Sequence, residues 1–294
     1  MTSPLIPTLS GQQLTVDAAL KHPSIIQTRI AKLADKQLLL GKFFRQLGTQ
    51  VQGGALLYST ITAADYYAAG GMEKRTPGAE YAVIEGVAPE PRLAPVEDWG
   101  AKAILPAEAI LRNDANLLDN TVTQLSNTLA RKLDTRAVAA LQAASIGSLA
   151  PAAGWDDLVM VGPLDAITPS ADRPSAHWAE AQEMADLEEL GVQHDLLIVH
   201  PEQAKQLRVA YAENLDAALE SAGFTNGMFA NPRIPIGQAF VLEQGAVGTV
   251  GFELPLTVDI WEEKGTRSWV LQVYAVPAMA VDRPYAAKKI TGLS

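Results

Sequence analysis

Two of the four histidines, His194 and His200, lie at the two ends of a short apolar run, Asp195 to Val199. Imidazole nitrogens are common zinc ligands, but a zinc site needs three or four ligands that converge on one point. Six residues of an extended strand span about 20 Å, so these two side chains are too far apart to share one ion. A site would need His177 or a carboxylate from elsewhere. We interpret His194 and His200 as residues that cap the two ends of a strand, and we predict no metal site.

Adjacent carboxylates are the next candidates, because paired carboxylates can act as general acid and base. The pairs are Asp156-Asp157, Glu188-Glu189 and Glu262-Glu263. Neighbours in sequence point apart in helices and in strands, so these pairs form no dyad. The glycine run from Gly245 to Gly251 lies between β-like segments and leads to Pro255, whereas a dinucleotide-binding fingerprint opens a helix. We predict turns or a strand edge there, and no catalytic residue, cofactor or enzymatic activity.

The bulk composition is that of a folded protein. With 294 residues, of which 48% are hydrophobic and 19% are charged, the chain can bury a large core in one large domain or two ordinary ones. It has no cysteine, which excludes disulfides and thiolate ligands and fits a reducing cytosol. No apolar run approaches the ~18 residues that a transmembrane helix needs, and the start, Met1 to Pro4, lacks the features of a signal peptide. We predict no membrane association.

The charge of the chain argues against a nucleic-acid-binding protein. The net charge is -10, and Lys and Arg occur only in short pairs such as Arg131-Lys132 and Lys288-Lys289. Proteins that bind duplex DNA need clustered Lys and Arg to neutralise phosphates. We therefore predict no direct, sequence-specific binding of nucleic acid.

The first half of the chain contains an arm, an interrupted β-segment and a long helix. Residues 1–53 are predicted to be an N-terminal arm, extended to Pro23 and then helical from Ser24 to Gly48. Residues 54–105 carry β-like runs at 55–62, 80–88 and 96–105, with a hairpin tip predicted at Pro89 to Arg92. Glycines and prolines interrupt every run, so this segment cannot bury a core of its own and should lie on something else.

A helix of roughly eight turns is predicted to begin at Asp114 or Asn116 and to end at Gly147. Its apolar residues are spaced three or four apart, which predicts one buried stripe. The stripe comprises Leu118, Val122, Leu125, Leu129, Leu133, Ala137 and Leu141. The opposite, polar face is predicted to carry Gln124, Asn127, Arg131, Asp134 and Gln142.

The second half reads as mixed helix and strand. A helix-like region, Trp155 to Val161, precedes an acidic helix from Ser175 to Leu190 that Gly191 ends. A strand, Asp195 to Val199, leads into a helix that starts at Glu202.

The C-terminal part predicts a β-hairpin. Two alternating runs, Leu256 to Glu262 and Ser268 to Val276, flank a turn in which Gly265 should supply the unusual φ. The run Ala278 to Val281 then reaches Asp282-Arg283-Pro284, which looks exposed, and a short basic tail with Lys288-Lys289.

This order of elements resembles the major capsid proteins of tailed bacteriophages of the Hong Kong 97 type. Three stretches carry the resemblance: WGAKAILPAEAILRNDANLLDNTVTQLSNTLARKL, LLIVHPEQAKQL and TVDIWEEKGTRSWVLQVYAVPAMAVDRP. They look like the return strand of the E-loop entering the spine helix, a strand–proline–helix unit of the axial domain, and the C-terminal hairpin with its Arg-Pro ending.

The resemblance implies an α+β capsid fold with an N-arm, an E-loop, a peripheral domain built on a long spine helix, and an axial domain. Its implied segments are the N-terminal arm 1–53, the E-loop 54–105, the peripheral domain 106–172, the axial domain 173–255 and the C-terminal sheet of the peripheral domain 256–294. In the E-loop, Glu90 and Arg92 at the tip and Glu97 and Asp98 on the return strand are the expected inter-subunit contacts.

The implied function is structural. The chain should assemble with itself as pentamers and hexamers into an icosahedral shell around phage double-stranded DNA, in the host cytoplasm. Expected partners are a scaffolding protein, a portal protein and a decoration protein. Some members begin with a long helical domain that a protease removes, whereas the arm here begins almost at Met1, so any scaffold should be a separate protein. An encapsulin-type nanocompartment shell and, more remotely, an α/β enzyme are the alternatives.

Overall fold

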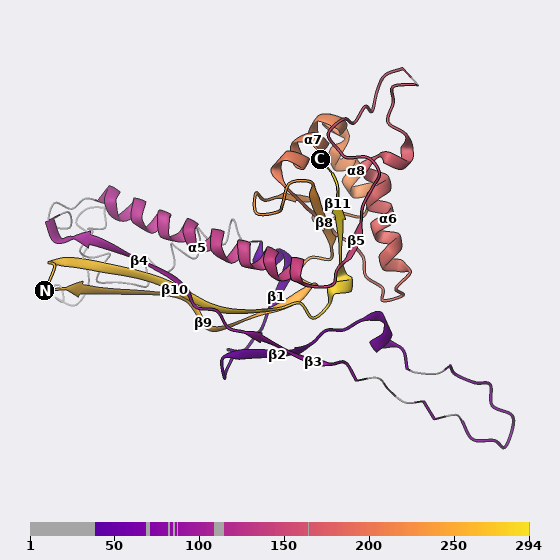
Figure 1. Ribbon diagram of the computed structural model, residues 1–294, viewed down its shortest axis with the longest axis horizontal. Coiled ribbons are helices and arrows are strands. Elements are labelled where there is room, and N and C mark those ends of the chain that lie inside the picture. Colours follow the sequence, from indigo (N-terminus) through magenta and orange to yellow (C-terminus); the bar gives the residue numbers. More distant parts are fainter. Residues whose placement is uncertain are drawn as a thin grey trace, which may run out of the picture.

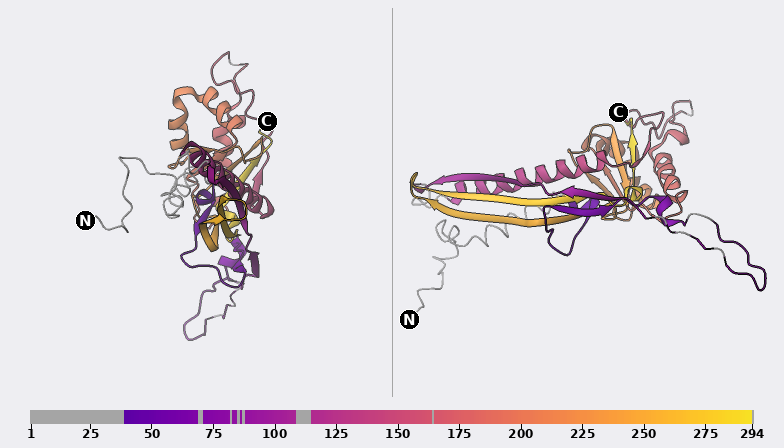
Figure 2. Two further views of the ribbon diagram at one scale, coloured as in Figure 1. Left: turned by 90° about the vertical axis from the view of Figure 1, so that its left-hand side faces the viewer. Right: turned by 60° about the horizontal axis from the view of Figure 1, so that its bottom comes forward.

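The computed structural model describes residues 39–68, 71–81, 83–84, 86, 88–108, 115–163 and 165–293. They form three parts (Figure 1, Figure 2). An elongated slab of strands and one long helix carries a lobe at one end, and a hairpin arm, residues 55–95, leaves that same end in a different direction. Helices and strands occur together, and most strand pairs are antiparallel, so the predicted α+β class is confirmed.

The slab contains a four-stranded sheet. Its strands, in spatial order, are β1 (Phe44–Gln46), β9 (Gly248–Glu263), β10 (Ser268–Ala280) and β4 (Trp99–Pro106). β9 and β10 form the predicted antiparallel hairpin, and both strands extend beyond the predicted runs. β10 also pairs with β4 along the whole length of β4, because the alternating residues of all three strands present one apolar face to the same helix.

The turn of this hairpin differs from the prediction. Arg267 adopts the left-handed φ of 47°, and Gly265 does not have a positive φ. Four residues connect Glu263 to Ser268. Loops of this length are usually built around a type I turn, which does not need glycine at its centre.

The long helix α5 (Ala115–Ala143) covers one face of the slab sheet (Figure 1). All seven residues of the predicted stripe are buried, which confirms the prediction. The first five pack on Leu105, Val258, Leu271 and Val273 of the sheet. The last two, Ala137 and Leu141, belong to a second core cluster that includes Phe43 and Phe240. The two ends of the helix differ from the prediction. Of the two predicted N-terminal residues, Asn116 lies inside the helix and Asp114 is outside the described residues. The helix stops at Ala143, and Gly147 begins the next strand.

The lobe is built on a five-stranded sheet. Its strands, in spatial order, are β5 (Gly147–Leu149), β11 (Ala287–Thr291), β8 (Gln238–Leu242), β6 (Leu196–Val199) and β7 (Met228–Ala230). Three helices cover it: α6 (Pro174–Asp186), α7 (Pro201–Tyr211) and α8 (Leu215–Ser221). The core between them includes Trp155, Trp178 and Phe224, whose rings meet edge to face.

The predicted basic tail is a buried strand. β11 lies between β5 and β8, and Lys288 has no exposed surface. Its Nζ donates to Oε1 of Glu188 at 2.6 Å, which offsets the cost of burying the charge. The sequence also predicted that residues 282–284, just before this strand, are exposed. That prediction is wrong at Pro284, which is buried. β11 therefore belongs to the sheet of the lobe, whereas the expected segment 256–294 grouped it with β9 and β10.

The hairpin arm has a paired root and an unpaired outer part. β2 (Ala55–Ser59) pairs with β3 (Pro91–Pro95), and Ser59 and Pro91 form the outermost pair. Two predictions are wrong here. Pro91 and Arg92 lie in a strand, and the chain turns at Thr76 to Ala79, where Gly78 takes a φ of 89°. None of the described residues from 80 to 88 is in a strand, because Gly86 and Pro89 interrupt the run.

The helix predicted from Ser24 to Gly48 falls mostly outside the described residues, and its end is wrong. The short α3 (Leu40–Phe43) stops where β1 pairs in parallel with Gly248 to Val250 of β9. A Cβ on Gly248 would overlap the ring of Phe44 and the carbonyl oxygen of Ala280. The absence of a side chain at Gly248 therefore allows Phe44 to pack directly against β9. The backbone of residues 44–46 forms hydrogen bonds with the sheet instead of continuing a helix.

Two further predictions change in detail. No helix forms at Trp155 to Val161, because the buried Trp155 donates its backbone N–H to Leu293. α6 ends at Asp186, four residues before the predicted end, and turns lead to Gly191, which has a φ of 68°. The remaining short helices are η1 (Ala63–Tyr66), η2 (Ser170–Asp172), η3 (Ala212–Asn214) and η4 (Pro284–Ala286). Among the described residues, no helix has the length and apolar character needed to cross a membrane.

Candidate assembly surface

The four predicted contact residues are not one cluster. Glu90 and Arg92 are exposed at the point where the arm enters β3, and Asp98 is exposed between β3 and β4. Arg92 also lines a hollow of about 420 Å³ between the root of the arm and α5. These three side chains are free to meet another molecule. Whether they do so remains a prediction.

Glu97 has an internal role. Its carboxylate accepts hydrogen bonds from both Nε and Nη2 of Arg136 on α5, the first at 2.6 Å, and from Nε1 of Trp99 at 2.9 Å. A two-point contact of this kind fixes the geometry of both partners. Glu97 therefore ties the return strand to the helix of its own subunit, which leaves it little capacity for a neighbour.

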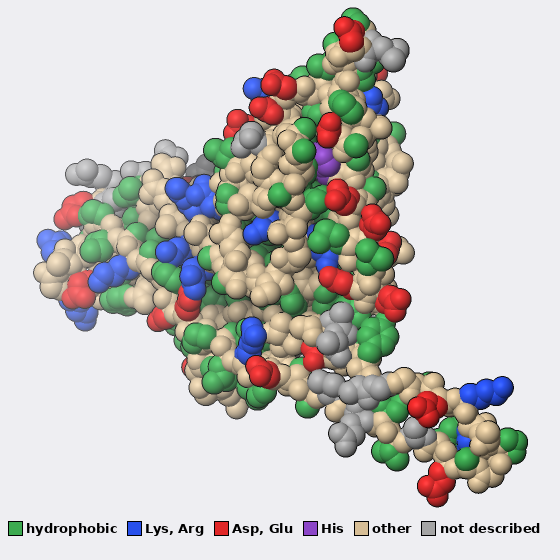
Figure 3. Space-filling model, turned by 45° about the vertical axis from the view of Figure 1, so that its right-hand side comes forward, with side chains coloured by type: hydrophobic (Ala, Val, Ile, Leu, Met, Phe, Trp, Pro, Cys, Tyr) green, Lys and Arg blue, Asp and Glu red, His purple; other side chains and the backbone are tan. Residues whose placement is uncertain are grey.

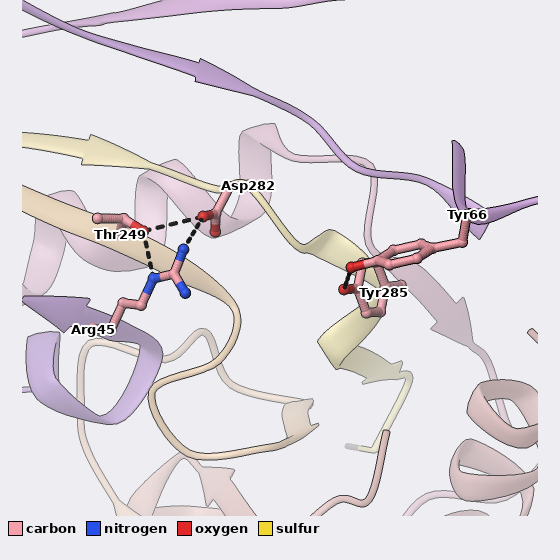
Figure 4. A network of polar contacts seen from close by, with 5 residues as sticks. All are labelled: Arg45, Tyr66, Thr249, Asp282 and Tyr285. Atoms are coloured by element: carbon pink, nitrogen blue, oxygen red, sulfur yellow. Dashed lines mark hydrogen bonds and ion pairs between the residues drawn. The ribbon is translucent and has the colours of Figure 1, made fainter. Parts of the chain in front are cut away.

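A second polar network, which sequence reasoning missed, fixes the base of the arm (Figure 4). Arg45 donates to Thr249 Oγ1 and to Asp282 Oδ2, both at 2.9 Å, and the backbone carbonyl of Asp282 accepts from Ile61 at 2.9 Å. The hydroxyls of Tyr66 and Tyr285 lie 2.9 Å apart in the same view. Burial, followed by the contact with Tyr66, raises the pKa of Tyr285. The arm is therefore held rigidly where it leaves the body.

Asp134 is also buried, although the sequence placed it on the polar face of α5. Its carboxylate accepts from the backbone N–H of Leu39 at 2.6 Å and from Nδ2 of Asn231 at 3.0 Å. It thus joins the segment before β1, the slab helix and the loop after β7. A signal was present: Ser126, Ala130 and Val138 recur in steps of four around Asp134, and all three are buried.

The outer part of the arm exposes apolar side chains. Met72 is 96% exposed and Val83 is 93% exposed, and Tyr81 is exposed as well. Beyond the β2–β3 pair the described residues of the arm have only a few backbone hydrogen bonds of their own, such as the turn at Thr76 to Ala79. Large exposed apolar side chains on a projecting hairpin are typical of a protein–protein contact.

Two of the three histidines in the described part of the chain make structural hydrogen bonds. His200 accepts from the backbone N–H of Glu202 and so caps α7, and the buried His177 accepts from Nε1 of Trp155 at 3.1 Å. His194 is buried before β6 rather than at an exposed strand end. Among the described residues, no three His, Asp or Glu side chains are grouped so that they could hold a metal ion.

Solved shell proteins share this architecture. The capsid of the cyanophage P-SCSP1u superposes with a TM-score of 0.60 at 11% identity, over 98% of this chain and 93% of that chain. The capsid of the Myoviridae phage XM1 gives 0.57 at 12% identity, over 87% and 91%. The virus-like particle from Pyrococcus furiosus gives 0.59 at 14% identity, over 92% and 99%. The fold is therefore that of the Hong Kong 97-type capsid proteins.

A match between the sequence and a family model shows the family to which the chain belongs. The model of the phage capsid protein family matches residues 89–290, which is more than half of the chain, and the protein belongs to that family. No curated protein matches the chain. The predicted membership is confirmed, and with it a structural role in a capsid.

Proposed function

We propose that this protein is the major capsid protein of a tailed phage and that it assembles as pentamers and hexamers into an icosahedral shell around double-stranded DNA. The observation that carries the proposal is the hairpin arm, which is rigid at its base, exposes Met72, Tyr81 and Val83, and has no core of its own. An isolated hairpin of this kind is marginal in water, so a neighbouring subunit is its natural support.

In this proposal the arm is the E-loop and α5 is the spine helix. The five segments expected from the sequence describe the subunit, with β5 and β11 assigned to the axial domain because they pair within the sheet of the lobe. The shell would form in the host cytoplasm, with a separate scaffolding protein, a portal protein and a decoration protein as partners, and the site of action would be the virion.

The first test is electron microscopy of the purified protein in negative stain. Closed icosahedral shells, or rings of five and six, are expected. A stable monomer at all concentrations and salt conditions would contradict the proposal. Regular shells that contain a specific protein cargo instead of DNA would favour the encapsulin-type alternative.

The second test removes the outer arm. Residues 71–86 are replaced by a Gly-Ser linker, so that β2, β3 and the Glu97–Arg136 contact remain. The subunit should keep its fold by circular dichroism and should form no regular shells by sedimentation. Unfolding would place the outer arm in the core of the subunit, and normal shells would show that the arm is dispensable for assembly.

A further inference from the structure

A groove with positively charged walls lies where the slab meets the lobe. It consists of two hollows of about 600 and 500 Å³ that share Arg131 and Arg233. The first hollow lies between α5 and β4, and the second lies between α5 and the loop after β7. Figure 3 shows several Lys and Arg side chains on the surface of the slab side of the molecule.

The lining of the groove is cationic at the rim and apolar beneath. Arg131, Lys132 and Arg233 provide the cations, and Nζ of Lys132 lies 4.1 Å from the centroid of the Trp99 ring. The single carboxyl in either lining is Asp134, which is buried and already accepts two hydrogen bonds. The apolar part comprises Trp99, Leu125, Leu129 and Val273. Such a groove fits an acidic protein segment that also carries an apolar side chain.

The outer face of α6 has the complementary character. Glu180, Glu183 and Asp186 are exposed, and among the described residues none of them forms an ion pair with Lys or Arg. Glu183 and Asp186 lie in the last turn of the helix, where the helix dipole disfavours negative charge. Leu187 follows directly and is 76% exposed. Within the described part of the chain these carboxylates have no cationic counter-charge, and Asp186 accepts only from the neutral Gln182 at 2.8 Å. A cationic partner would stabilise them.

The two surfaces lie on opposite sides of the molecule. In Figure 1, α6 forms the right-hand edge of the lobe, whereas α5 and β4, which carry the groove, extend from its left-hand side. The hairpin arm leaves on the α6 side. Beyond its β2–β3 pair, Tyr67 donates to the backbone carbonyl of Glu189, just after the acidic face of α6, at 2.9 Å. Surfaces placed in this way suit a head-to-tail contact between identical subunits, which can close into a ring.

We propose that the acidic face of α6 in one subunit docks into the cationic groove of the next subunit around a ring, which deepens the proposed capsid function and rests on it. Glu183 and Asp186 face Arg131, Lys132 and Arg233 of the neighbour, and Leu187 covers the apolar part of the groove. The partner is a second copy rather than DNA, because three cations on a chain of net charge -10 can neutralise only a few phosphates.

Charge reversal tests the contact. Glu183→Lys with Asp186→Lys should abolish rings and shells, and so should Arg131→Glu with Lys132→Glu, while circular dichroism and thermal unfolding of the subunits stay unchanged. The four substitutions together restore opposite charges and should restore assembly. The control has the same net charge as the fourfold variant but places the new carboxylates elsewhere. It combines the α6 variant with Lys264→Glu and Arg267→Glu at the tip of the β9–β10 hairpin, and it should not assemble. Assembly of the control, or failure of the fourfold variant to assemble, would overturn the proposal.

The absence of cysteine allows a direct test of proximity. Glu183→Cys with Thr128→Cys, which lies in the groove, should give a ladder of disulfide-linked chains up to five and six on a non-reducing gel. Either substitution alone, or Glu183→Cys with Lys264→Cys, should give no such ladder.

The outcomes separate this inference from the proposed function. Wild-type shells without the ladder and without charge rescue would overturn the contact and leave the capsid function standing. A monomeric wild type would overturn both. A third outcome would assign the groove to nucleic acid. In it, the wild-type protein binds duplex DNA, and the variant with Arg131→Glu and Lys132→Glu loses this binding but still forms regular shells.

Discussion

Asp134 and His194 are two buried titratable side chains whose pKa values are displaced in opposite senses. Loss of solvent raises the pKa of Asp134 from 3.8 to about 6, although the hydrogen bonds from Leu39 and Asn231 favour its charged form. Loss of solvent, followed by the nearby charge of Lys288, lowers the pKa of His194 from 6.5 to about 4. Both groups change protonation between pH 4 and 7, so in the wild type their effects partly cancel.

The carboxyl of Asp134 makes the subunit more stable in acid. Between pH 3.8 and about 6 the folded state binds more protons than the unfolded state. Its stabilising contribution is therefore complete below pH 3.8 and is lost as the pH rises through about 6, by about 3 kcal/mol. We expect the difference in free energy of unfolding between the wild type and Asp134→Asn to fall by this amount from pH 4 to pH 7 in urea titrations. A difference that does not vary with pH would contradict the burial of a charged Asp134.

His194 has the opposite effect. Its stabilising contribution is present above pH 6.5, where both states are neutral, and is lost as the pH falls through about 4, because the unfolded chain takes up a proton first. The loss is about 3 kcal/mol. Urea titrations of His194→Gln should therefore show a shallower loss of stability in acid than those of the wild type. An identical acid profile would mean that the imidazole stays protonated or exposed in the folded subunit.

At the scale of elements, the spine helix α5 depends on its leucine stripe. Leu129 is buried against the slab sheet, so Leu129→Ala should lower the free energy of unfolding by about 2–5 kcal/mol through lost burial and a cavity. Gln124→Ala, an exposed position on the same helix, serves as the control and should change it by less than about 0.5 kcal/mol. Unfolding in urea measures both. A Leu129→Asp variant with wild-type stability would disprove the packing of the helix.

Local patterns predicted some elements well. The stripe of α5 and the alternation of β9 and β10 are periodic along the chain, so their faces follow from spacing alone. The acidic α6 and the strand–proline–helix unit at Pro201 also follow from adjacent residues. The same reasoning found the family, because the order of these elements is itself informative.

The errors arose where the partner of a residue is distant in sequence. Asp134 is buried by Leu39 and Asn231, which are 95 and 97 positions away, and Lys288 by Glu188, which is 100 positions away. No local period records such pairs, so a polar face and a basic tail were predicted instead. The internal contact of Glu97 was missed for the same reason, because its partner Arg136 comes from the following helix. The groove and its relation to α6 appear only in three dimensions.

At the scale of the whole molecule, the net charge of -10 bears on how the proposed shell would act on enclosed DNA. Binding to a DNA duplex depends on many Lys and Arg neutralising phosphates and releasing counterions, and an acidic protein with three cations in its groove offers few such contacts. We expect purified protein to retain no duplex DNA at about 0.15 M salt in co-sedimentation, with a basic DNA-binding protein as the positive control. Retention that weakens steeply with salt would reveal a phosphate-binding surface that the charge count hides.

The position of β11 between β5 and β8 has a consequence for how the subunit folds. In the sheet, β5 pairs with β11 alone. Gly147 of β5 pairs with Lys288 of β11, and the chain between them contains the other elements of the lobe and the β9–β10 hairpin. Closing so long a loop is slow in comparison with forming a hairpin. The hairpin should therefore appear early, and β8 should keep an open edge until β11 arrives. Open edges recruit strands from other chains, so substitutions that weaken β11 should show themselves first as temperature-sensitive aggregation during synthesis.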